Sequence, residues 1–143
     1  MIQLIKATKS DWSFILELRN GFYENFYKQT KPIELDEHTN YLESQLTNPK
    51  FHHWIIEYDD KKIGYVRILD DDVGIMIKNE FQNKGLATKA LKLVEEKAKS
   101  LGITKLIAKV KVENESSKRI FENNNFKLQM DHQHWHQYQK EIK

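Results

Sequence analysis

Cysteine is missing from all 143 residues, so disulfide bonds and thiolate chemistry are excluded. No apolar run approaches the ~20 residues that a membrane-spanning helix needs. The opening stretch, MIQLIKATKSDW, also lacks the apolar core of a signal peptide. We therefore expect a cytoplasmic protein with no membrane partner.

An excess of charge of one sign is missing as well. The 23 Lys and Arg residues nearly balance the 21 Asp and Glu residues, which leaves a formal net charge of +2. Proteins that bind nucleic acids carry a concentrated basic surface, and no such concentration is visible along this chain. We expect a small-molecule partner rather than a nucleic acid.

The hydrophobic pattern predicts a single α/β domain that spans residues 1–143. Ser10 and Asp36 are placed to cap the first two helices, and Gly102 is placed to end the long third helix. The tail predicts two further strands. The expected order is β-α-α-β-β-β-α-β-α-β-β around a mixed sheet. Its strands include 52–58, 63–69, 73–78 and 105–112, with the last two parallel.

The stretch FQNKGLATKAL, at 81–91, follows a predicted strand and opens a predicted helix. It contains Gly85, and no acidic residue occurs from Phe81 to Val94. The first N–H groups of a helix lack partners in the helix and attract anions. The stretch therefore predicts a phosphate-binding turn, with an ordinary strand-to-helix turn as the alternative. Neither a Walker loop nor a Rossmann fingerprint fits its single glycine.

Two motifs resemble those of the GNAT superfamily of acetyl-CoA-dependent N-acetyltransferases. Residues 82–87, QNKGLA, resemble the family's Gln/Arg-x-x-Gly-x-Gly/Ala motif. About thirty residues later, Asn114, Ser117, Phe121 and the pair Asn125-Phe126 resemble its second motif, Asn…Ala/Ser…Tyr…Gly-Phe. The expected element order is also that of the family, so the resemblance covers nearly the whole chain.

The resemblance implies a binding site for acetyl-CoA in the cleft between strands 73–78 and 105–112, which splay apart in this family. The backbone N–H groups of the turn would hold the pyrophosphate, and the edge of the first strand would pair with the pantetheine arm. Lys118 would approach the cofactor or be only a solvated residue, and Asn114 would reach the cofactor or act only as a helix cap. The implied cofactor residues are Ile75, Met76, Ile77, Gln82, Asn83, Lys84, Gly85, Leu86, Ala87, Thr88, Asn114, Ser117, Lys118 and Phe121.

The residues that would act as acid and base in the implied reaction match the family's pattern less well than the cofactor motifs do. Phe121 stands where the family often has a tyrosine that protonates the leaving thiolate. A neutral amine must also be generated before it can attack. His38 and Asp72 are the candidate catalytic residues. The alternatives are a partly exposed helix histidine at His38 and a solvated turn at 70–72.

The segment that contains Leu18-Arg19-Asn20 and Glu37-His38 resembles a branch with nucleotide-sugar amine and ribosomal-protein N-acetyltransferases. This resemblance implies an acceptor pocket for a small amine or an amino sugar. Its candidate residues are Arg19, Asn20, Tyr23 and Phe26, although the aromatic ones are also suited to packing on the sheet.

The run HQHWH, at 132–136, predicts three imidazoles on one face of a strand, a spacing that suits a metal. No further ligand completes the set, so we expect no metal site.

The sequence thus predicts an N-acetyltransferase that moves an acetyl group from acetyl-CoA directly to a primary amine, as a monomer or homodimer. Two alternatives remain. One is a catalytically silent acyl-CoA-binding or regulatory module, and the other is a protein-interaction domain that no longer binds the cofactor.

Overall fold

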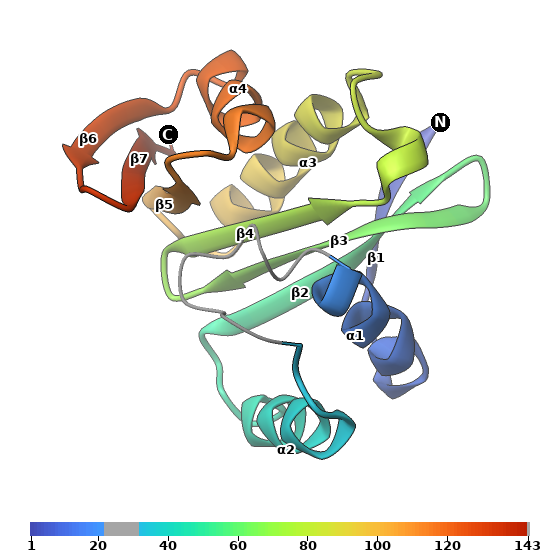
Figure 1. Ribbon diagram of the computed structural model, residues 1–143. Coiled ribbons are helices and arrows are strands. Elements are labelled where there is room, and N and C mark those ends of the chain that lie inside the picture. The colour runs from blue at the N-terminus through green and yellow to red at the C-terminus, as the bar shows by residue number, and fades with distance from the viewer. Residues whose placement is uncertain (22–31, 143) are drawn as a thin grey trace.

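The computed structural model describes residues 1–21 and 32–142, and Figure 1 shows a mixed seven-stranded sheet with helices on both faces. The strands lie in the order β1-β2-β3-β4-β5-β7-β6. They are β1 (Ile2–Lys6), β2 (Phe51–Tyr58), β3 (Lys61–Leu69), β4 (Asp72–Ile77), β5 (Lys105–Lys111), β6 (Lys127–Asp131) and β7 (Trp135–Glu141).

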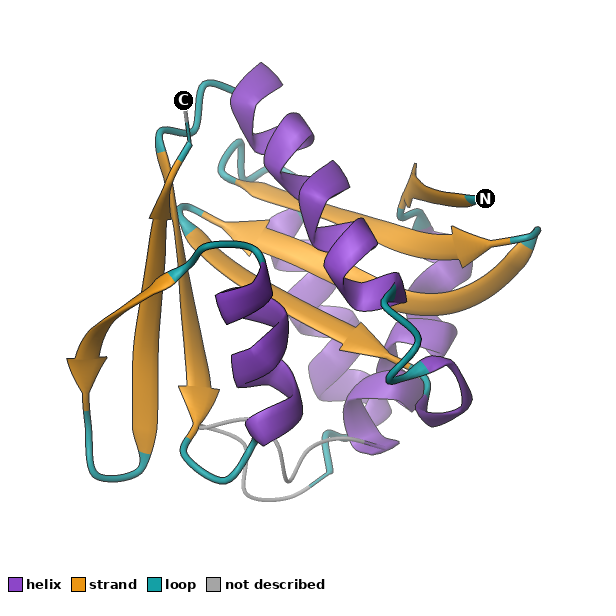
Figure 2. Ribbon diagram, turned by 90° about the horizontal axis from the view of Figure 1, so that it is seen from above, coloured by secondary structure: helices purple, strands orange, loops and turns teal. Residues whose placement is uncertain are grey.

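Helices α1 and α2 lie on one face of the sheet, and α3 and α4 lie on the other (Figures 1 and 2). This arrangement confirms the expected fold class and element order. Among the described residues, none of the helices has the length and apolar character needed to cross a membrane. The helices are α1 (Trp12–Gly21), α2 (Leu35–Gln45), α3 (Leu86–Ser100) and α4 (Glu115–Asn123), with short 3-10 turns at η1 (Lys9–Asp11) and η3 (Asn79–Phe81).

The expected caps of the first two helices were wrong. Thr8, not Ser10, begins the first helical segment, where its N–H donates to Asp11 Oδ2 at 2.9 Å. Glu34, not Asp36, precedes α2, and Asp36 lies inside the first turn. A carboxylate in that position still favours the helix because it faces the positive end of the helix dipole. The expected stop at Gly102 agrees with its φ of +78°.

The main core lies between the sheet and helices α3 and α4. On α3, Ala90, Leu91, Val94 and Ala98 are fully buried and form the apolar stripe that faces this core. Each large side chain of this kind contributes roughly 1.5–3 kcal/mol when it is removed from water. A smaller cluster beneath α1 includes Ile15, Leu18 and Tyr65. The two layers fix α1 and α3 on opposite faces of β3 and β4.

The sheet opens at its centre. Strands β4 and β5 are parallel, but the ladder between them has only the Asp72–Ile107 pair, beside which the Ile107 N–H donates to Asp71 O at 2.7 Å. Figure 2 shows the two strands diverging beyond that point. On its other side β4 pairs with β3 from Asp72 to Ile77. The far end of β4 therefore presents one edge that the described ladder leaves open, which confirms the expected splayed strand pair.

The close approach of β3 and β4 depends on Gly64. A Cβ added there would lie 2.3 Å from Met76 O, a backbone atom that cannot move without shifting β4. We expect Gly64→Ala to lower the free energy of unfolding by about 1–3 kcal/mol, measured by urea denaturation. Gly21→Ala is the matched control, because a Cβ at Gly21 meets nothing within 4 Å among the described residues. Equal stability of the two variants would contradict this packing argument.

Candidate functional site

A cleft of about 740 Å³ lies where β4 and β5 diverge. Its floor is the β4 segment that includes Ile75, Met76 and Ile77, all of which line it. Residues from β3, the turn into α3, β5 and α4 form the walls, and Arg19 of α1 lies at one end. The cleft thus joins the open strand edge to the amino terminus of α3.

Two left-handed residues shape the turn into α3, namely Asn83 with φ of +60° and Gly85 with φ of +76°. Gly85 precedes the helix, and no side chain caps the first turn. The first helical bond runs from Lys89 N–H to Gly85 O at 3.2 Å, so the preceding N–H groups lie outside the helical ladder. A Cβ at Gly85 would meet no atom of residues 1–21 or 32–142 within 4 Å. The positive φ, and not crowding by protein atoms, therefore requires the glycine.

Not all backbone N–H groups of residues 82–88 are available to a ligand, because the first of them already has a partner. The Gln82 N–H already donates to Asn79 O at 3.2 Å. Its side chain amide donates to Ile77 O at 2.9 Å, which ties the turn to the end of β4. Asn83, Gly85, Ala87 and Thr88 also line the cleft.

Lys84 and Leu86 are not among the described residues that line the cleft. The Lys84 ammonium lies 5.9 Å from the centre of the Phe81 ring, and Leu86 is buried in the main core. Only their backbone groups belong to the turn that opens into the cleft.

Helix α4 contributes Asn114, Ser117 and Phe121 to the cleft wall. Asn114 Oδ1 accepts from the Ser117 N–H at 3.1 Å, so the alternative role of Asn114 as a cap is confirmed alongside its place in the wall. Phe121 packs edge-on against Phe126, with ring centres 5.1 Å apart. Lys118 is buried next to Glu115 and does not line the cleft.

Asn20, near the end of α1, holds the backbone of Ile33 shortly before α2. Its side chain donates to Ile33 O at 3.0 Å and accepts from the Ile33 N–H at 2.7 Å. This two-point contact fixes Ile33, which lines the cleft, whereas Asn20 itself does not line it. Tyr23 and Phe26 lie outside the described residues.

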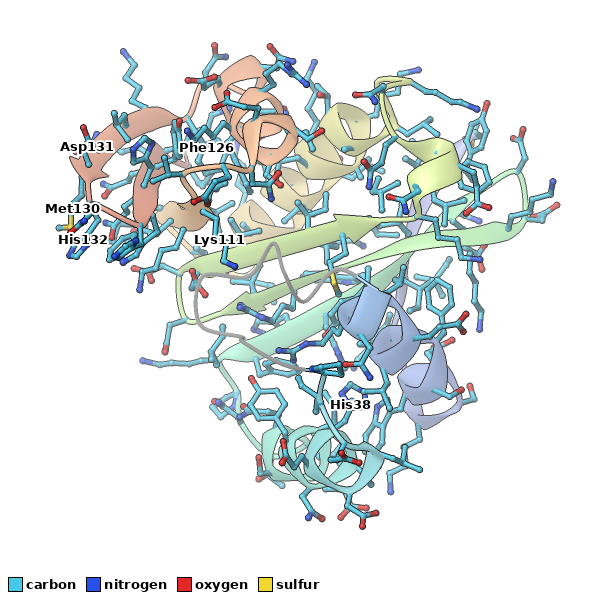
Figure 3. All side chains as sticks on the ribbon, viewed as in Figure 1. His38, Lys111, Phe126, Met130, Asp131 and His132 are labelled. Carbon is cyan, nitrogen blue, oxygen red and sulfur yellow. The ribbon has the colours of Figure 1, made fainter. Side chains whose placement is uncertain are left out.

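His38 lies between α2 and α1 (Figure 3) and is only 2% exposed, so the alternative of a partly exposed histidine was wrong. Its Nε2 lies 3.0 Å from Trp12 O, and because a carbonyl only accepts, this nitrogen carries the proton. Nδ1 is then an acceptor, buried without a hydrogen-bond partner among the described residues. Burial lowers the pKa of His38, and the nearby Arg19 charge lowers it further, although the bond to Trp12 O opposes them. The ring is therefore neutral at pH 7.

A side pocket of about 280 Å³ lies against His38. It shares Arg19, Ile33 and Arg67 with the main cleft, so the two spaces adjoin. Glu37 and Tyr41 complete its wall. The His38 imidazole is thus placed beside the α1 end of the main cleft and not beside the turn into α3.

Asp72 begins β4 and is engaged by Arg67. Arg67 Nη1 and Nη2 each donate to Asp72 Oδ2 at 3.2 Å, and Nη1 also donates to Asp72 O at 3.1 Å. The alternative of a solvated turn was therefore wrong for Asp72, whose side chain is 30% exposed. Its carboxylate holds a guanidinium at the cleft wall, so it is a poorer candidate for a base than the sequence indicated.

Arg67 is a site residue that the sequence analysis missed. The sequence did carry a signal, because the chain has twenty lysines and only three arginines. All three arginines, Arg19, Arg67 and Arg119, line the main cleft. Of the lysines in the described segments, only Lys109 does so. In this lysine-rich chain, the three arginines therefore indicate the position of the cleft.

A partly buried pair of polar side chains lies at the same wall. His53 Nδ1 lies 2.9 Å from the Tyr65 hydroxyl, and Tyr65 lines the cleft. Burial lowers the pKa of His53 to about 4 and raises the pKa of Tyr65. Both groups are therefore neutral at pH 7 and act as hydrogen-bonding partners.

The expected row of three imidazoles in the tail was wrong. Strand β7 begins only at Trp135, so His132 and His134 lie in the turn before it. His132 stacks on Trp135, and His136 Nε2 lies 2.8 Å from Asp131 Oδ1. Figure 3 shows Asp131 and His132 far from His38. Within residues 1–21 and 32–142, no group of three metal-ligating side chains occurs.

A mixed sheet splayed at its centre, with a glycine-initiated helix at the opening, places this chain in the class of acetyltransferase-like α/β folds. The sequence model of the Acetyltransferase (GNAT) family matches residues 12–126, so the chain belongs to that family. No curated protein matches the chain in sequence.

Solved structures share the whole fold at low sequence identity. A domain from Methanocaldococcus jannaschii DSM 2661 has a TM-score of 0.87 at 22% identity, with 99% of each chain covered. Spermidine N-acetyltransferase from Vibrio cholerae, solved with CoA and spermine, has a TM-score of 0.87 at 18% identity, with 99% of this chain and 95% of that chain covered. An N-acetyltransferase from Campylobacter jejuni, solved with acetyl coenzyme A, has a TM-score of 0.76 at 16% identity, with both chains fully covered.

The lowered pKa of His53 predicts a pH-dependent stability. Below pH 6.5 the unfolded chain binds a proton that the folded protein accepts only near pH 4, so folding weakens across this window. We expect wild type to lose about 2 kcal/mol more unfolding free energy than His53→Gln between pH 7 and pH 4, after allowance for partial exposure. Denaturant titrations at several pH values measure this difference. Parallel pH profiles for the two proteins would contradict it.

Proposed function

We propose that this protein is an acetyl-CoA-dependent N-acetyltransferase that acts on the primary amine of a small molecule, by direct attack in a ternary complex. One observation carries the proposal. The open edge of β4 and the amino terminus of α3 face the same cleft. The first offers backbone groups to an amide-bearing arm, and the second offers N–H groups to a phosphate.

In the proposed complex, the backbone around Asn83 to Thr88 holds the pyrophosphate. The β4 segment with Ile75, Met76 and Ile77 pairs with the pantetheine arm as an additional strand would. Asn114, Ser117 and Phe121 contact the arm from α4, since all three line the same cleft. Lys84 contributes positive charge at the turn.

Bound acetyl-CoA supplies a thioester carbonyl that the amine attacks. The protein must position the amine, accept its proton and stabilise the leaving thiolate. A thiolate with a pKa near 8.5 leaves without much help at neutral pH, so Phe121 in place of a tyrosine does not prevent the reaction. Removing the amine proton is then the more demanding step.

His38 is the better candidate for the base. Its Nδ1 is an acceptor, and its lowered pKa keeps it neutral at pH 7. It lies against a side pocket that adjoins the main cleft through Arg19 and Arg67. Asp72 is the second candidate, because it lines the cleft although Arg67 engages it.

The acceptor is proposed to bind at the α1 end of the cleft, where Arg19 lies. Tyr23 and Phe26 are proposed to extend this region with aromatic surface. A small amine or a nucleotide-linked amino sugar fits such a combination. The likeness to spermidine N-acetyltransferase supports a small-molecule amine as the acceptor class.

A catalytically silent acyl-CoA-binding module is the second candidate function. The observation that favours it is Phe121, which has no hydroxyl at the cleft wall. Such a module binds acetyl-CoA yet neither hydrolyses it nor acetylates amines. Release of free thiol in the presence of an amine panel separates the two functions.

Gly85→Glu tests the cofactor site. A carboxylate at the start of α3 repels phosphate and occupies the space above the turn, so we expect acetyl-CoA affinity to fall at least ~100-fold. Gly102→Glu is the matched control, because Gly102 has nearly the same positive φ and lies at the other end of α3. Isothermal titration that gives wild-type affinity for folded Gly85→Glu would contradict the site.

The pH profile of kcat/KM tests the base. A base works when deprotonated, so the rate of wild type should fall as pH drops through the pKa of His38, below 6.5. His38→Gln keeps a donor toward Trp12 O, and we expect it to lose this acidic limb and about 100-fold or more in rate. An unchanged profile in His38→Gln, with the limb lost instead in Asp72→Asn, would assign the base to Asp72.

A further inference from the structure

We propose that the acceptor amine carries an oxyanion, a carboxylate or a phosphate, and that Arg67 and Arg19 bind it. This inference rests on the proposed acetyltransferase function and names the substrate class of the same site. It separates this chain from polyamine acetyltransferases, whose acceptors are purely cationic.

Arg67 is held as a fixed guanidinium at the cleft wall. Within the described part of the chain, its bonds to Asp72 use three of its five N–H groups, which leaves two for a ligand. Gly74 lies directly beneath it, because a Cβ at that position would lie 3.5 Å from both Cζ and Nη2 of Arg67. The guanidinium therefore lies at van der Waals distance from this position of β4. An arginine fixed in this way loses little freedom when it binds an oxyanion.

A second guanidinium lies nearby. Arg19 lines both the main cleft and the side pocket, as Arg67 does. Burial and the nearby charge of Arg67 both lower the pKa of Arg19. An oxyanion placed between the two cations relieves their mutual repulsion and accepts charge-assisted hydrogen bonds.

The charged residues that line the main cleft also favour an anionic ligand. They are those of Arg19, Arg67, Lys109 and Arg119, with Asp72 as the one carboxylate in the described wall. Glu37 belongs only to the side pocket, and its side chain is exposed. A polyamine brings two or more positive charges into this setting, where the described wall offers it one engaged carboxylate. An amine with an oxyanion balances the arginines and still presents its amine to the acetyl group.

The chain uses arginine rather than lysine here. Arginine presents a planar fork that matches a carboxylate or a phosphate, whereas a lysine is a compact and strongly hydrated point charge. His38 Nδ1 adds an acceptor at the side pocket, which suits an O–H or N–H group on the same ligand. The site therefore favours a polar acceptor with an oxyanion and a donor group.

The test compares matched acceptors that differ in the oxyanion alone. One pair is lysine and its decarboxylated amine, and a second pair is glucosamine 6-phosphate and glucosamine, with spermidine as the polyamine. We expect kcat/KM to be about 10–100-fold higher for the anionic member of at least one pair, mainly through KM. The pair that shows the effect tells whether a carboxylate or a phosphate is preferred.

Arg67→Ala should remove this preference, so the ratio of kcat/KM between the anionic member and its matched neutral or cationic partner should fall about 10–100-fold. Arg67→Lys keeps the charge without the fork and should recover only part of the loss. Lys50→Ala is the control, because it removes one positive charge at an exposed turn next to β3 and should leave the preference intact.

The same pairs are titrated calorimetrically into the protein with and without CoA. The binding affinities then test the preference even if turnover is too slow to measure. Equal or better use, or binding, of decarboxylated amines and spermidine overturns the inference and leaves the acetyltransferase proposal standing. Failure of acetyl-CoA itself to bind overturns the proposed function. Oxyanion binding that survives in Arg67→Ala also overturns the inference.

Discussion

The site depends on one constraint, namely that β4 and β5 pair at a single position and then part. At Asp72, β4 contacts Leu69 of β3 and Ile107 of β5, and the Ile107 N–H donates to Asp71 O. Beyond this junction β3 continues to pair with β4, so only the edge that faces β5 is left open. Because α3 connects the two strands, its amino terminus lies at the end of the same opening. An extended cofactor with amides along its length and phosphates at one end suits that combination of strand edge and helix terminus.

The same junction organises the other end of the cleft. Asp72 joins three strands through its backbone and holds Arg67 through its side chain. Arg67 in turn lies over Gly74 and next to Arg19. A polar wall of arginine, tyrosine and neutral histidine is thereby built on the α1 face of the sheet, opposite the apolar core under α3. The main apolar core thus lies under α3, whereas the α1 face combines a smaller apolar cluster with groups able to recognise an acceptor.

Much of the fold was readable from local patterns. The apolar stripe with Leu91 and Val94, the left-handed Gly85 and Gly102, and the alternating strands each follow from chemistry within a few residues. The parts that failed depend on contacts between distant segments. Arg67 is only five residues from Asp72, but their contact depends on how β3 pairs with β4. Nothing near His38 in sequence shows that Trp12 O will fix its tautomer. The row of imidazoles failed for a local reason, since the turn into β7 took up two of them.

The central claim is that the open edge of β4 and the first N–H groups of α3 bind acetyl-CoA, and backbone amide NMR shifts upon titration test it most directly. We predict large shifts for the amides of 74–77 and 83–88, and small ones for β2, whose backbone is paired on both sides by β1 and β3. Saturable binding that leaves 74–77 and 83–88 unshifted, or no binding at all, would contradict the account.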